Sequence, residues 1–534
     1  MAYLLWHYLR DSAALQPDRP AVQSEGMVLT YGELDDSSSR LATAITACGL
    51  RPGDRFGMYM PKTARSVAVT QGVSKAGGAY VPIDPNAPAA RAAYILGNCA
   101  VKGLAITSRK LSQLSEFLRD IPSLEVVLVI DDAPQATAPE GVRLLSWSDA
   151  MNTLPLPPAG DGVIEDDPAY LLYTSGSTGS PKGVIISHRN AMAFVDWAAE
   201  TFNVRAEDRL SNHAPLHFDL SVLDIYAALR SGACVVVVPE GLSSFPVELA
   251  AWIEREQISI WYSVPSALTR LLLHGQLDRF AYQRLRCVLF AGEVFPVKYL
   301  REVMTHLSHA DFYNLYGPTE TNVCTYYPVP RELPTDSDIS IGMSCRNTHT
   351  FAITDSGTVA GVGEEGELFV RGPTVMLGYW GLPEKTDEML STNPAQKAYR
   401  EPVYRTGDLV RVEPDGNYRF LGRRDHMVKS RGYRIELGEI EQTIYRDERI
   451  KEAVVVAIPD DEIGSRLKAV VVVHAGHTMT RAELQGFCLK HLPRYMVPED
   501  FIFEDELPRT STGKADRQAV QHRVIDVMRT VQAS

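Results

Sequence analysis

A loop rich in glycine and hydroxyl side chains follows the apolar run Tyr170–Tyr173, and it ends at Lys182. Glycines let backbone N–H groups converge on an anion, hydroxyl groups add hydrogen-bond donors, and a lysine adds positive charge. The segment is not a Walker A loop, because that motif needs Ser or Thr after the lysine and Gly183 stands there. A flexible surface loop is the alternative. The position directly after a strand-like run favours phosphate binding.

This loop resembles the phosphate loop of the adenylate-forming enzymes, which include acyl-CoA synthetases, luciferases and the adenylation domains of peptide synthetases. Five further segments resemble motifs of that superfamily and occur in the expected order: Phe218–Tyr226, Asn314–Glu320, Tyr404–Asp408, Gly422–Glu436 and Pro508–Lys514. Because these matches span essentially the whole chain, we identify it as a member of the superfamily. The resemblance implies an AMP-forming acid–thiol ligase that uses ATP and Mg²⁺.

The implied reaction has two halves. A carboxylate attacks the α-phosphate of ATP and displaces pyrophosphate, and a thiol then attacks the acyl-adenylate and displaces AMP. Such chemistry depends mainly on positioning and charge neutralisation. Lys514 matches the family's catalytic lysine, whose ammonium bridges the carboxylate and the α-phosphate; a solvated surface lysine is the alternative. One lost transition-state contact costs about 3–4 kcal/mol, so a Lys514→Ala variant should lose adenylation by ~100-fold or more.

The resemblance also implies roles for the other motif residues. Glu320 matches the Mg²⁺ carboxylate, and the Thr178 hydroxyl supports the ion or the pyrophosphate. Asp408 is expected to accept hydrogen bonds from the ribose hydroxyls, and the ring of Tyr316 to face adenine, although a core aromatic is the alternative for Tyr316. The expected ATP-binding residues are Thr174, Ser175, Gly176, Ser177, Thr178, Gly179, Lys182, Gly292, Glu293, Asn314, Leu315, Tyr316, Gly317, Pro318, Thr319, Asp408, Phe420, Arg423 and Lys514.

A hinge is implied between the two half-reactions, since the thiol needs the space that Lys514 occupies during the first. Asp425 matches the hinge residue of the family, about which the small domain rotates. After rotation the segment Lys429–Arg434 would line the thiol tunnel, and Gly432 would allow close approach of the thiol arm.

Asp219 indicates which acids are activated. In the resemblance, the amino-acid-activating members carry an aspartate here that pairs with the substrate ammonium, whereas activators of fatty and aryl acids lack it. The alternative is a helix N-cap that opens the segment Ser221–Leu229. The surrounding Phe-Asp-Leu-Ser pattern favours the ammonium role.

The substrate side chain is expected to meet an uncharged pocket. Alignment with the family's pocket motifs gives its walls as Leu220, Leu223, Ser263, Leu289, Ala291, Leu315, Val323 and Cys324, with Lys514 at the carboxylate. The leucines fill much of the cavity, which predicts a small amino acid, with L-alanine favoured. These positions could equally be ordinary strand core. One methylene is worth only ~1–3 kcal/mol in such a pocket, so Ala, Gly and Ser would be separated imperfectly.

The closest subgroup resembles the stand-alone D-alanine–carrier-protein ligases of cell-wall modification. That group commonly has Cys where this chain has Ala291, which argues against D-selectivity. Similar free-standing enzymes load amino acids, including β-amino acids, onto carriers of macrolactam polyketide pathways, so natural-product biosynthesis is expected. The expected thiol is the phosphopantetheine of a separate acyl or peptidyl carrier protein. An acyl- or aryl-CoA synthetase and a catalytically inactive binding protein are the alternatives.

Composition agrees with an enzyme of this kind. The 534 residues carry 53 Lys+Arg and 66 Asp+Glu, a net charge of −13, which disfavours nucleic-acid binding. No apolar run approaches the ~18 residues of a membrane span, and the N-terminus reads as an amphipathic helix, not a signal peptide. Seven scattered cysteines without a C-x-x-C pair indicate reduced thiols in the cytoplasm. We expect a monomer or weak dimer.

Helical and strand patterns alternate over residues 1–130 and 169–330, which predicts a layered α/β fold with a largely parallel sheet. Residues 133–168 read as a surface excursion, and 341–424 as a small antiparallel barrel or sheet. The last ~110 residues have an α+β pattern. We therefore expect a large N-terminal domain, 1–424, that holds the ATP and amino-acid site, and a small mobile C-terminal domain, 425–534.

Overall fold

The computed structural model describes residues 2–131, 137–157, 162–176, 180–333, 339–396, 398–424, 427–509 and 515–533. The chain divides into two compact units. The large unit comprises Met1–Pro85, Ala92–Tyr173 and Gly183–Arg424; the small unit comprises Asn86–Arg91, Thr174–Lys182 and Asp425–Ser534. The phosphate-loop segment is therefore grouped with the C-terminal residues.

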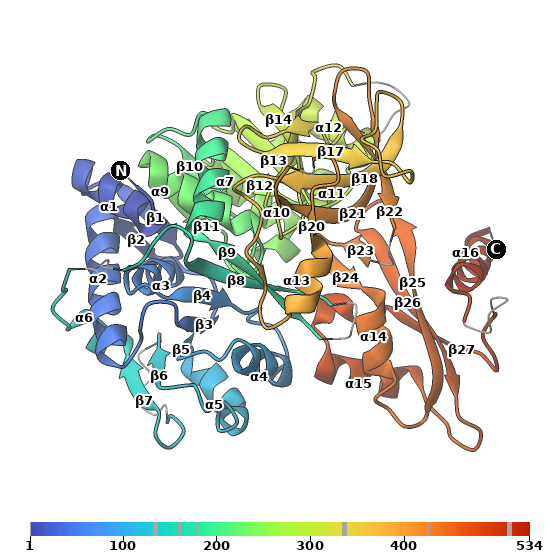
Figure 1. The fold of residues 1–534 in the computed structure, drawn as a ribbon, viewed down its shortest axis with the longest axis horizontal. Helices are drawn as coiled ribbons and strands as arrows, with labels where there is room; N and C mark the ends of the chain where they lie inside the picture. The colour runs from blue at the N-terminus through green and yellow to red at the C-terminus, as the bar shows by residue number, and fades with distance from the viewer. Residues whose placement is uncertain are drawn as a thin grey trace. The chain divides into compact units, whose positions relative to one another are not determined.

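The first sheet of the large unit is built around parallel strands, with antiparallel strands at both edges (Figure 1). Its order is β16-β15-β14-β13-β12-β10-β11-β1-β2. The bounds are β1 (Pro20–Ser24), β2 (Met27–Thr30), β10 (Arg209–Asn212), β11 (Cys234–Val237), β12 (Ile260–Ser263), β13 (Cys287–Ala291), β14 (Asp311–Tyr316), β15 (Thr325–Pro328) and β16 (Met343–Ser344).

Helices cover one face of this sheet because its strands are apolar on both sides. Trp261, Val288 and Phe290 pack there against α10 (Pro246–Arg255), α11 (Pro265–His274) and α12 (Val297–His306). The alternate residues of the same strands join the main core on the other side. The remaining helical segments of this region are α1 (Trp6–Leu15), α7 (His188–Thr201), α8 (Leu220–Val222), a π-helix (Leu223–Ala227) and α9 (Ala228–Ser231).

The second sheet has the order β19-β9-β8-β4-β3-β5-β6-β7. Its strands are β3 (Arg55–Tyr59), β4 (Ala79–Pro82), β5 (Gly103–Ile106), β6 (Val126–Val129), β7 (Arg143–Ser146), β8 (Pro168–Thr174), β9 (Lys182–Ser187) and β19 (Gly378–Tyr379). The associated helices are α2 (Tyr31–Ala47), α3 (Ala64–Lys75), α4 (Ala89–Asn98), α5 (Ser108–Leu118) and α6 (Trp147–Met151). The layered α/β fold is thus confirmed.

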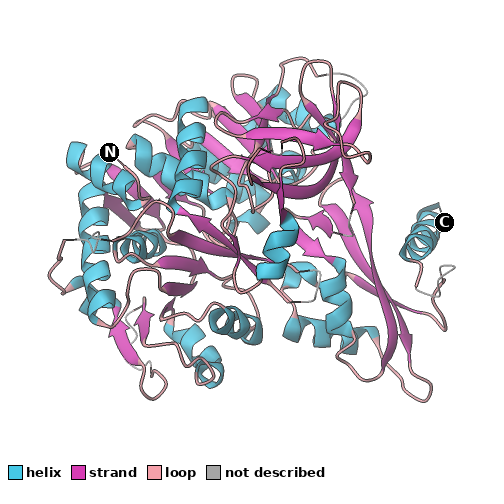
Figure 2. Cartoon of the chain, in the orientation of Figure 1, coloured by secondary structure: helices cyan, strands magenta, loops and turns pink. Residues whose placement is uncertain are grey.

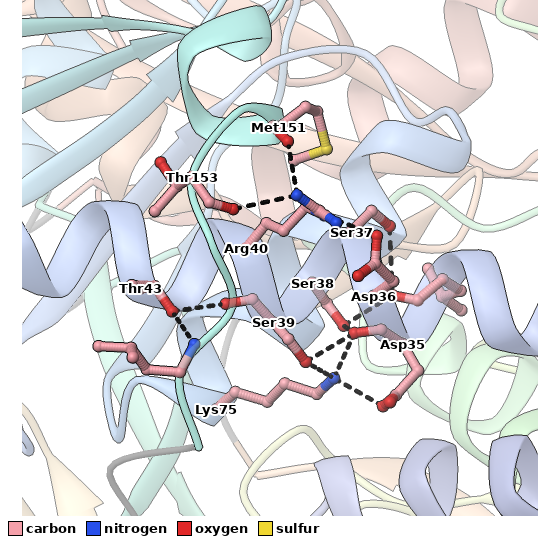
Figure 3. Close-up of polar contacts among 12 residues, drawn as sticks. Asp35, Asp36, Ser37, Ser38, Ser39, Arg40, Thr43, Lys75, Met151 and Thr153 are labelled. Atoms are coloured by element: carbon pink, nitrogen blue, oxygen red, sulfur yellow. Dashed lines mark hydrogen bonds and ion pairs between the residues drawn. The ribbon is translucent and has the colours of Figure 1, made fainter.

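Helices α2 and α3 show how this region is held together (Figure 3). Lys75, only 2 % exposed, donates to the backbone oxygen of Asp35 at 2.8 Å, to its carboxylate at 2.7 Å and to Ser39 Oγ at 2.9 Å. All three ammonium donors are used, which a buried lysine requires. Gly72 lets the helices approach, because a Cβ there would lie 2.8 Å from Leu41.

In the described part of the expected surface excursion, residues 137–157 and 162–167, the regular elements are β7 and α6. Strand β7 extends the second sheet by parallel pairing with β6. Helix α6 begins with a reciprocal capping box between Ser146 and Asp149, and Trp147 is buried. The Pro- and Gly-rich flanks hid this short strand and helix, because a five-residue helix is too short to show a periodic pattern.

The third sheet, predicted as a small barrel or antiparallel sheet, is antiparallel. It contains β17 (His349–Ile353), β18 (Glu365–Arg371), β20 (Leu390–Thr392), β21 (Pro402–Val412) and β22 (Tyr418–Arg423), with α13 (Pro383–Met389) beside it.

The small unit has a sheet with the order β25-β26-β27 and a separate hairpin, β23-β24. The long strands β25 and β26 form most of the sheet (Figure 2). Alternate residues bury one face against α14 and α15 and the other against α16. The bounds are β23 (Met427–Ser430), β24 (Tyr433–Glu436), α14 (Leu437–Ile444), β25 (Ile450–Asp460), β26 (Gly464–Val473), α15 (Arg481–His491), β27 (Asp500–Phe503) and α16 (Arg517–Ala533). None of the helices in the described part of the chain has the length and apolar content that spanning a bilayer requires.

Candidate active site

The carboxyl ends of three neighbouring parallel strands, β12, β13 and β14, carry most of the predicted amino-acid pocket. Ligands of open α/β sheets bind at such strand ends. The register places Tyr262 beside Leu289, and Ala291 beside Leu315. Because side chains alternate along a strand, these four side chains lie on one face of the sheet.

This face continues into the helix that follows β10 and into the segment after β14. Together they form an apolar wall, which we define as the buried residues Leu220, Leu223, Tyr262, Leu289, Ala291, Leu315, Val323 and Cys324. Seven of the eight pocket residues expected from the sequence belong to this wall. The eighth, Ser263, does not.

Ser263 lies on the opposite face of β12. Its hydroxyl accepts a hydrogen bond from Trp261 Nε1 at 2.8 Å, and its neighbour on β13 is Phe290, a residue of the core under helices α10–α12. Ser263 and Tyr262 are adjacent in β12 and therefore face opposite sides of the sheet, and the expected contact between Ser263 and the substrate stays a prediction. Tyr262, 1 % exposed, belongs to the wall.

Asp219 directly precedes helix α8, as predicted, but its carboxylate does not cap that helix. Burial and the negative charge of Asp219 together raise the pKa of Tyr170 and of Tyr262 well above the usual range. The carboxylate therefore lies near two buried hydroxyl groups, one from each large sheet. An anionic group beside an apolar wall is suited to bind a cationic head group next to an apolar side chain.

Asp408 stands at the centre of a polar network on strands β14, β21 and β22. Its carboxylate accepts a hydrogen bond from the hydroxyl of Tyr316. It also forms an ion pair with Arg423, whose Nη1 lies 2.6 Å from Asp408 Oδ1. Asp408 and Arg423 are direct neighbours across the antiparallel pair. Burial, followed by the charge of Asp408, raises the pKa of Tyr316 well above normal, so this phenol stays a donor. Three predicted nucleotide residues thus lie together.

Tyr316 is a buried core aromatic, which is the alternative that its sequence left open, and its expected contact with adenine stays a prediction. Phe420, on β22, packs at the edge of the same core. Asn314 donates its amide to the backbone oxygen of Ser340 at 2.8 Å. Glu293 accepts a hydrogen bond from the Ser266 amide at 2.9 Å and so lies at the N-terminus of α11, where negative charge is favoured.

The turn Gly317–Glu320 follows β14 and is tightly constrained. A Cβ on Gly317 would lie 1.8 Å from the backbone oxygen of Asn322, so only glycine fits. Pro318 closes the turn by accepting the Thr321 amide at 2.9 Å. Glu320 is fully buried, and its Oε1 accepts a hydrogen bond from the Tyr379 hydroxyl at 2.7 Å. A carboxylate is a ligand type that suits a hard cation such as Mg²⁺, and the expected metal role of Glu320 stays a prediction.

The phosphate-loop residues that the structure describes lie in the small unit. The Gly176 amide donates to Glu439 Oε2 at 3.2 Å, and Ser175 Oγ donates to the Arg434 backbone oxygen at 2.8 Å. The loop amide therefore has a carboxylate acceptor in this structure, and the expected role of the loop in phosphate binding stays a prediction. Lys182 is buried at the start of β9.

Several predicted residues are outside the described part of the chain: Ser177, Thr178, Gly179, Asp425 and Lys514. Lys429 and Gly432 are described and belong to the β23–β24 hairpin, where Arg431 and Gly432 form the turn with positive φ. Gly292 also has positive φ, at the end of β13. In the described ranges, no group of three or more His, Cys, Asp and Glu residues could hold a metal ion.

Sequence reasoning missed Tyr170 and Tyr262 as neighbours of Asp219. Both lie in strands that are apolar on each face, where alternation does not distinguish the two faces. The register of β12 against β13 provides the missing information.

Comparison with known proteins agrees with this arrangement. The profile described as "AMP-binding enzyme" matches residues 9–380, and "AMP-binding enzyme C-terminal domain" matches 439–514. An L-proline–[L-prolyl-carrier protein] ligase of Pseudomonas fluorescens is 40 % identical over 98 % of this chain and 99 % of its own. Another from Streptomyces coelicolor is 38 % identical, over 95 % and 94 %.

Among solved structures, the adenylation domain AlmE of Vibrio cholerae, in complex with glycyl-adenosine-5′-phosphate, is similar with a TM-score of 0.84. It is 25 % identical, and the match covers 98 % of both chains. Sequence and fold thus agree with the resemblance seen in the motifs. The chain belongs to the AMP-binding enzyme family and is an adenylate-forming ligase.

Proposed function

We propose that this ligase activates L-proline as prolyl-AMP and transfers it to the phosphopantetheine thiol of a separate carrier protein. The observation that carries the proposal is the position of Asp219 beside the apolar wall. Its carboxylate suits the secondary ammonium of proline, and the wall, with the flat ring of Tyr262, suits the pyrrolidine ring. Two relatives that match nearly the whole chain are named for L-proline.

The sequence alone favoured L-alanine, and the two nearly full-length relatives named for L-proline are the reason to change that expectation. Tyr262 adds an aromatic ring to the wall. A cyclic side chain of three methylenes buries more apolar surface on such a wall than a methyl group, at about 0.8 kcal/mol per CH₂. L-proline is therefore preferred over L-alanine in this proposal.

In the first step, formation of the adenylate, different residues bind the ammonium, the ribose and the phosphates. Asp219 holds the ammonium, and Asp408 accepts hydrogen bonds from the ribose hydroxyls with the lone pairs that Tyr316 and Arg423 leave available. Mg²⁺ supplies neutralisation of phosphate charge when bound, and Glu320 is the described carboxylate suited to hold it. The substrate carboxylate forms a bond to the α-phosphorus as the bond to pyrophosphate breaks, and Lys514 stabilises the developing charge.

The second step transfers the acyl group. The phosphopantetheine thiol loses its proton and forms a C–S bond, while the C–O bond to AMP breaks. The two relatives that are named as ligases of a carrier protein support a carrier protein as acceptor. We expect transfer to a phosphopantetheinylated carrier protein to be faster than transfer to coenzyme A.

ATP–pyrophosphate exchange with matched acids tests the proposal. The panel is L-proline, D-proline, L-alanine, D-alanine, glycine, a β-amino acid and cyclopentanecarboxylate, which has a ring like that of proline without the amino group. L-proline should give the fastest exchange and cyclopentanecarboxylate almost none. Exchange only with cyclopentanecarboxylate would indicate an acyl-CoA synthetase, and no exchange with any acid would indicate a binding protein. Faster exchange with L-alanine would overturn the choice of proline alone.

A further inference from the structure

A largely buried polar cluster of Lys62, Asn212 and Asp224 lies close to the apolar wall, since burial and then the charges of Asp219 and Asp224 raise the pKa of Tyr262. Lys62, in the loop before α3, donates to the successive backbone oxygens of Asn212, His213 and Ala214, at 2.6 Å for His213. These oxygens belong to the end of β10 and the start of the turn that leads to Asp219. The ammonium group thus holds the Asn212 and His213 peptide groups closely and lies 3.4 Å from the Ala214 oxygen.

The far end of the same segment is fixed by a second contact. Asn212 Nδ2 donates to Asp224 Oδ2 at 3.2 Å, and both side chains are at most 1 % exposed. Asp224 lies in the π-helix Leu223–Ala227, a rare form that occurs often at functional sites. Residues 213–224 therefore form a segment that begins directly after Asn212 and ends at Asp224, whose carboxylate accepts a hydrogen bond from the Asn212 side chain.

The burial of Asp224 favours its neutral form. Burial raises the pKa of Asp224 well above the usual range, although Asn212 and Lys62 oppose the rise. Asn212 Oδ1 is buried without a hydrogen-bond partner in the described structure, and a protonated carboxyl group could donate to it. A neutral acid and an amide can satisfy each other with two hydrogen bonds.

The segment between these two contacts carries three residues of the amino-acid site: Asp219, Leu220 and Leu223. We propose that Lys62 and Asp224 are positioning residues, which fix this segment so that Asp219 and the two leucines meet the amino acid together. The proposal rests on the proposed amino-acid site but not on the identity of the amino acid. A preorganised segment loses less conformational entropy when the substrate binds, so the cluster acts on amino-acid affinity.

Lys75 provides a matched control for a merely structural role. It is a buried lysine of the same large unit, and its three donors are also all used, by Asp35 and Ser39 (Figure 3). Its contacts join α2 to α3 and include no residue of the site. Loss of either lysine should destabilise the fold, but only loss of Lys62 should change amino-acid binding.

The experiment compares Lys62→Met, Lys62→Arg and Lys75→Met in the full-length enzyme at pH 6.5, by ATP–pyrophosphate exchange with the amino acid that the wild-type enzyme uses best. Lys62→Met should raise the KM for the amino acid at least 10-fold, with kcat and the KM for ATP within about 3-fold. Lys62→Arg should recover most of the affinity, and Lys75→Met should leave all three constants near wild type. An unchanged amino-acid KM in Lys62→Met would overturn the proposal, as would an equal effect in Lys75→Met.

Asp224 gives a second route if Lys62→Met does not fold. Asp224→Asn keeps a group that can donate and accept, whereas Asp224→Leu removes both functions at similar volume. Only Asp224→Leu should raise the amino-acid KM and reduce the discrimination between the best amino acid and its nearest competitor. Equal constants in both variants would contradict the positioning role. The wild-type panel tests the substrate separately, so failure of L-proline as substrate leaves this comparison intact.

Discussion

The amino-acid side and the nucleotide side of the large unit are built in different ways. On the nucleotide side, the residues expected to bind ATP also bind each other, since Asp408 joins Tyr316 and Arg423 directly. On the amino-acid side, Asp219 does not cap its helix, and separate residues behind it, Lys62 and Asp224, hold its segment. On the nucleotide side, the same residues are expected to bind the substrate and to hold the site in place. On the amino-acid side, different residues have these two roles.

This difference has a functional consequence. A substitution on the nucleotide side removes a ligand and a support at once, so affinity and stability should fall together. On the amino-acid side, the two properties can be changed separately. The variants below test this division.

The largest effect is expected for Asp219→Asn, which keeps the shape of the side chain and removes its charge. Loss of one partner of a buried charge pair costs about 2–5 kcal/mol, so kcat/KM for the amino acid should fall about 100-fold or more in exchange assays. The KM for ATP and the melting temperature should change little. Asp311→Asn, whose exposed carboxylate pairs with Arg331, is the control. A wild-type constant for Asp219→Asn would refute the ammonium role.

Asp408→Asn should act on the other substrate and on the fold together. The variant weakens the contacts to Arg423 and Tyr316 as well as the expected ribose contact, and charged hydrogen bonds are worth about 1.5–3 kcal/mol. We expect the KM for ATP to rise about 10- to 100-fold and the melting temperature to fall, with the amino-acid KM unchanged. If ATP affinity fell with no change in the melting temperature, Asp408 would bind ATP without stabilising the fold, and the contrast between the nucleotide side and the amino-acid side would not hold.

A smaller effect separates the two faces of β12. Tyr262→Ala should raise the amino-acid KM about 10-fold, because it opens the apolar wall. Ser263→Ala should leave both KM values within about 3-fold and destabilise the enzyme by about 1 kcal/mol, since Trp261 Nε1 loses its buried acceptor. Exchange kinetics and thermal unfolding measure both. The reverse pattern would restore Ser263 to the pocket.

The sequence predicted much of this arrangement because short motifs fix local backbone and side-chain chemistry together. Asp219, Tyr316, Glu320 and Asp408 each stand beside turn residues whose conformational demands are visible in the sequence, such as Gly317. Helix α2 begins directly after Thr30, which forms a reciprocal capping box with Glu33. Such features depend on a few neighbouring residues and can be read without tertiary contacts.

What the sequence did not predict depends on contacts between distant residues. Tyr262 and Ser263 are distinguished only by the register of β12 against β13. Lys62 is 150 residues from Asn212 in the chain, and its role becomes apparent only when β10 is placed beside it. The π-helix was expected as an ordinary helix over Ser221–Leu229, because the extra residue of a π-turn leaves no compositional sign.

The smallest predicted effect concerns pH, and it separates support from binding within a single residue. Burial lowers the pKa of Lys62 from 10.5 to about 7, although the charges of Asp224 and Glu240 act to raise it. Burial and the charge of Lys62 also lower the pKa of the nearby His213 to about 3, so His213 stays neutral in this pH range. Between pH 7 and 10.5 the unfolded chain holds a proton on this lysine that the folded chain lacks, so its contribution to stability rises with pH.

Amino-acid affinity should change in the opposite direction over the same range. A neutral amine has two N–H donors for the three backbone oxygens that Lys62 binds, so the turn before Asp219 loses one contact above pH 7. The amino-acid KM should therefore rise a few-fold from pH 6 to pH 9, while the free energy of unfolding increases. Lys62→Arg stays charged throughout and should show neither trend. If amino-acid affinity and the free energy of unfolding both fell as the pH rises, partial unfolding of the site would be indicated instead, because titration of Lys62 changes the two quantities in opposite directions.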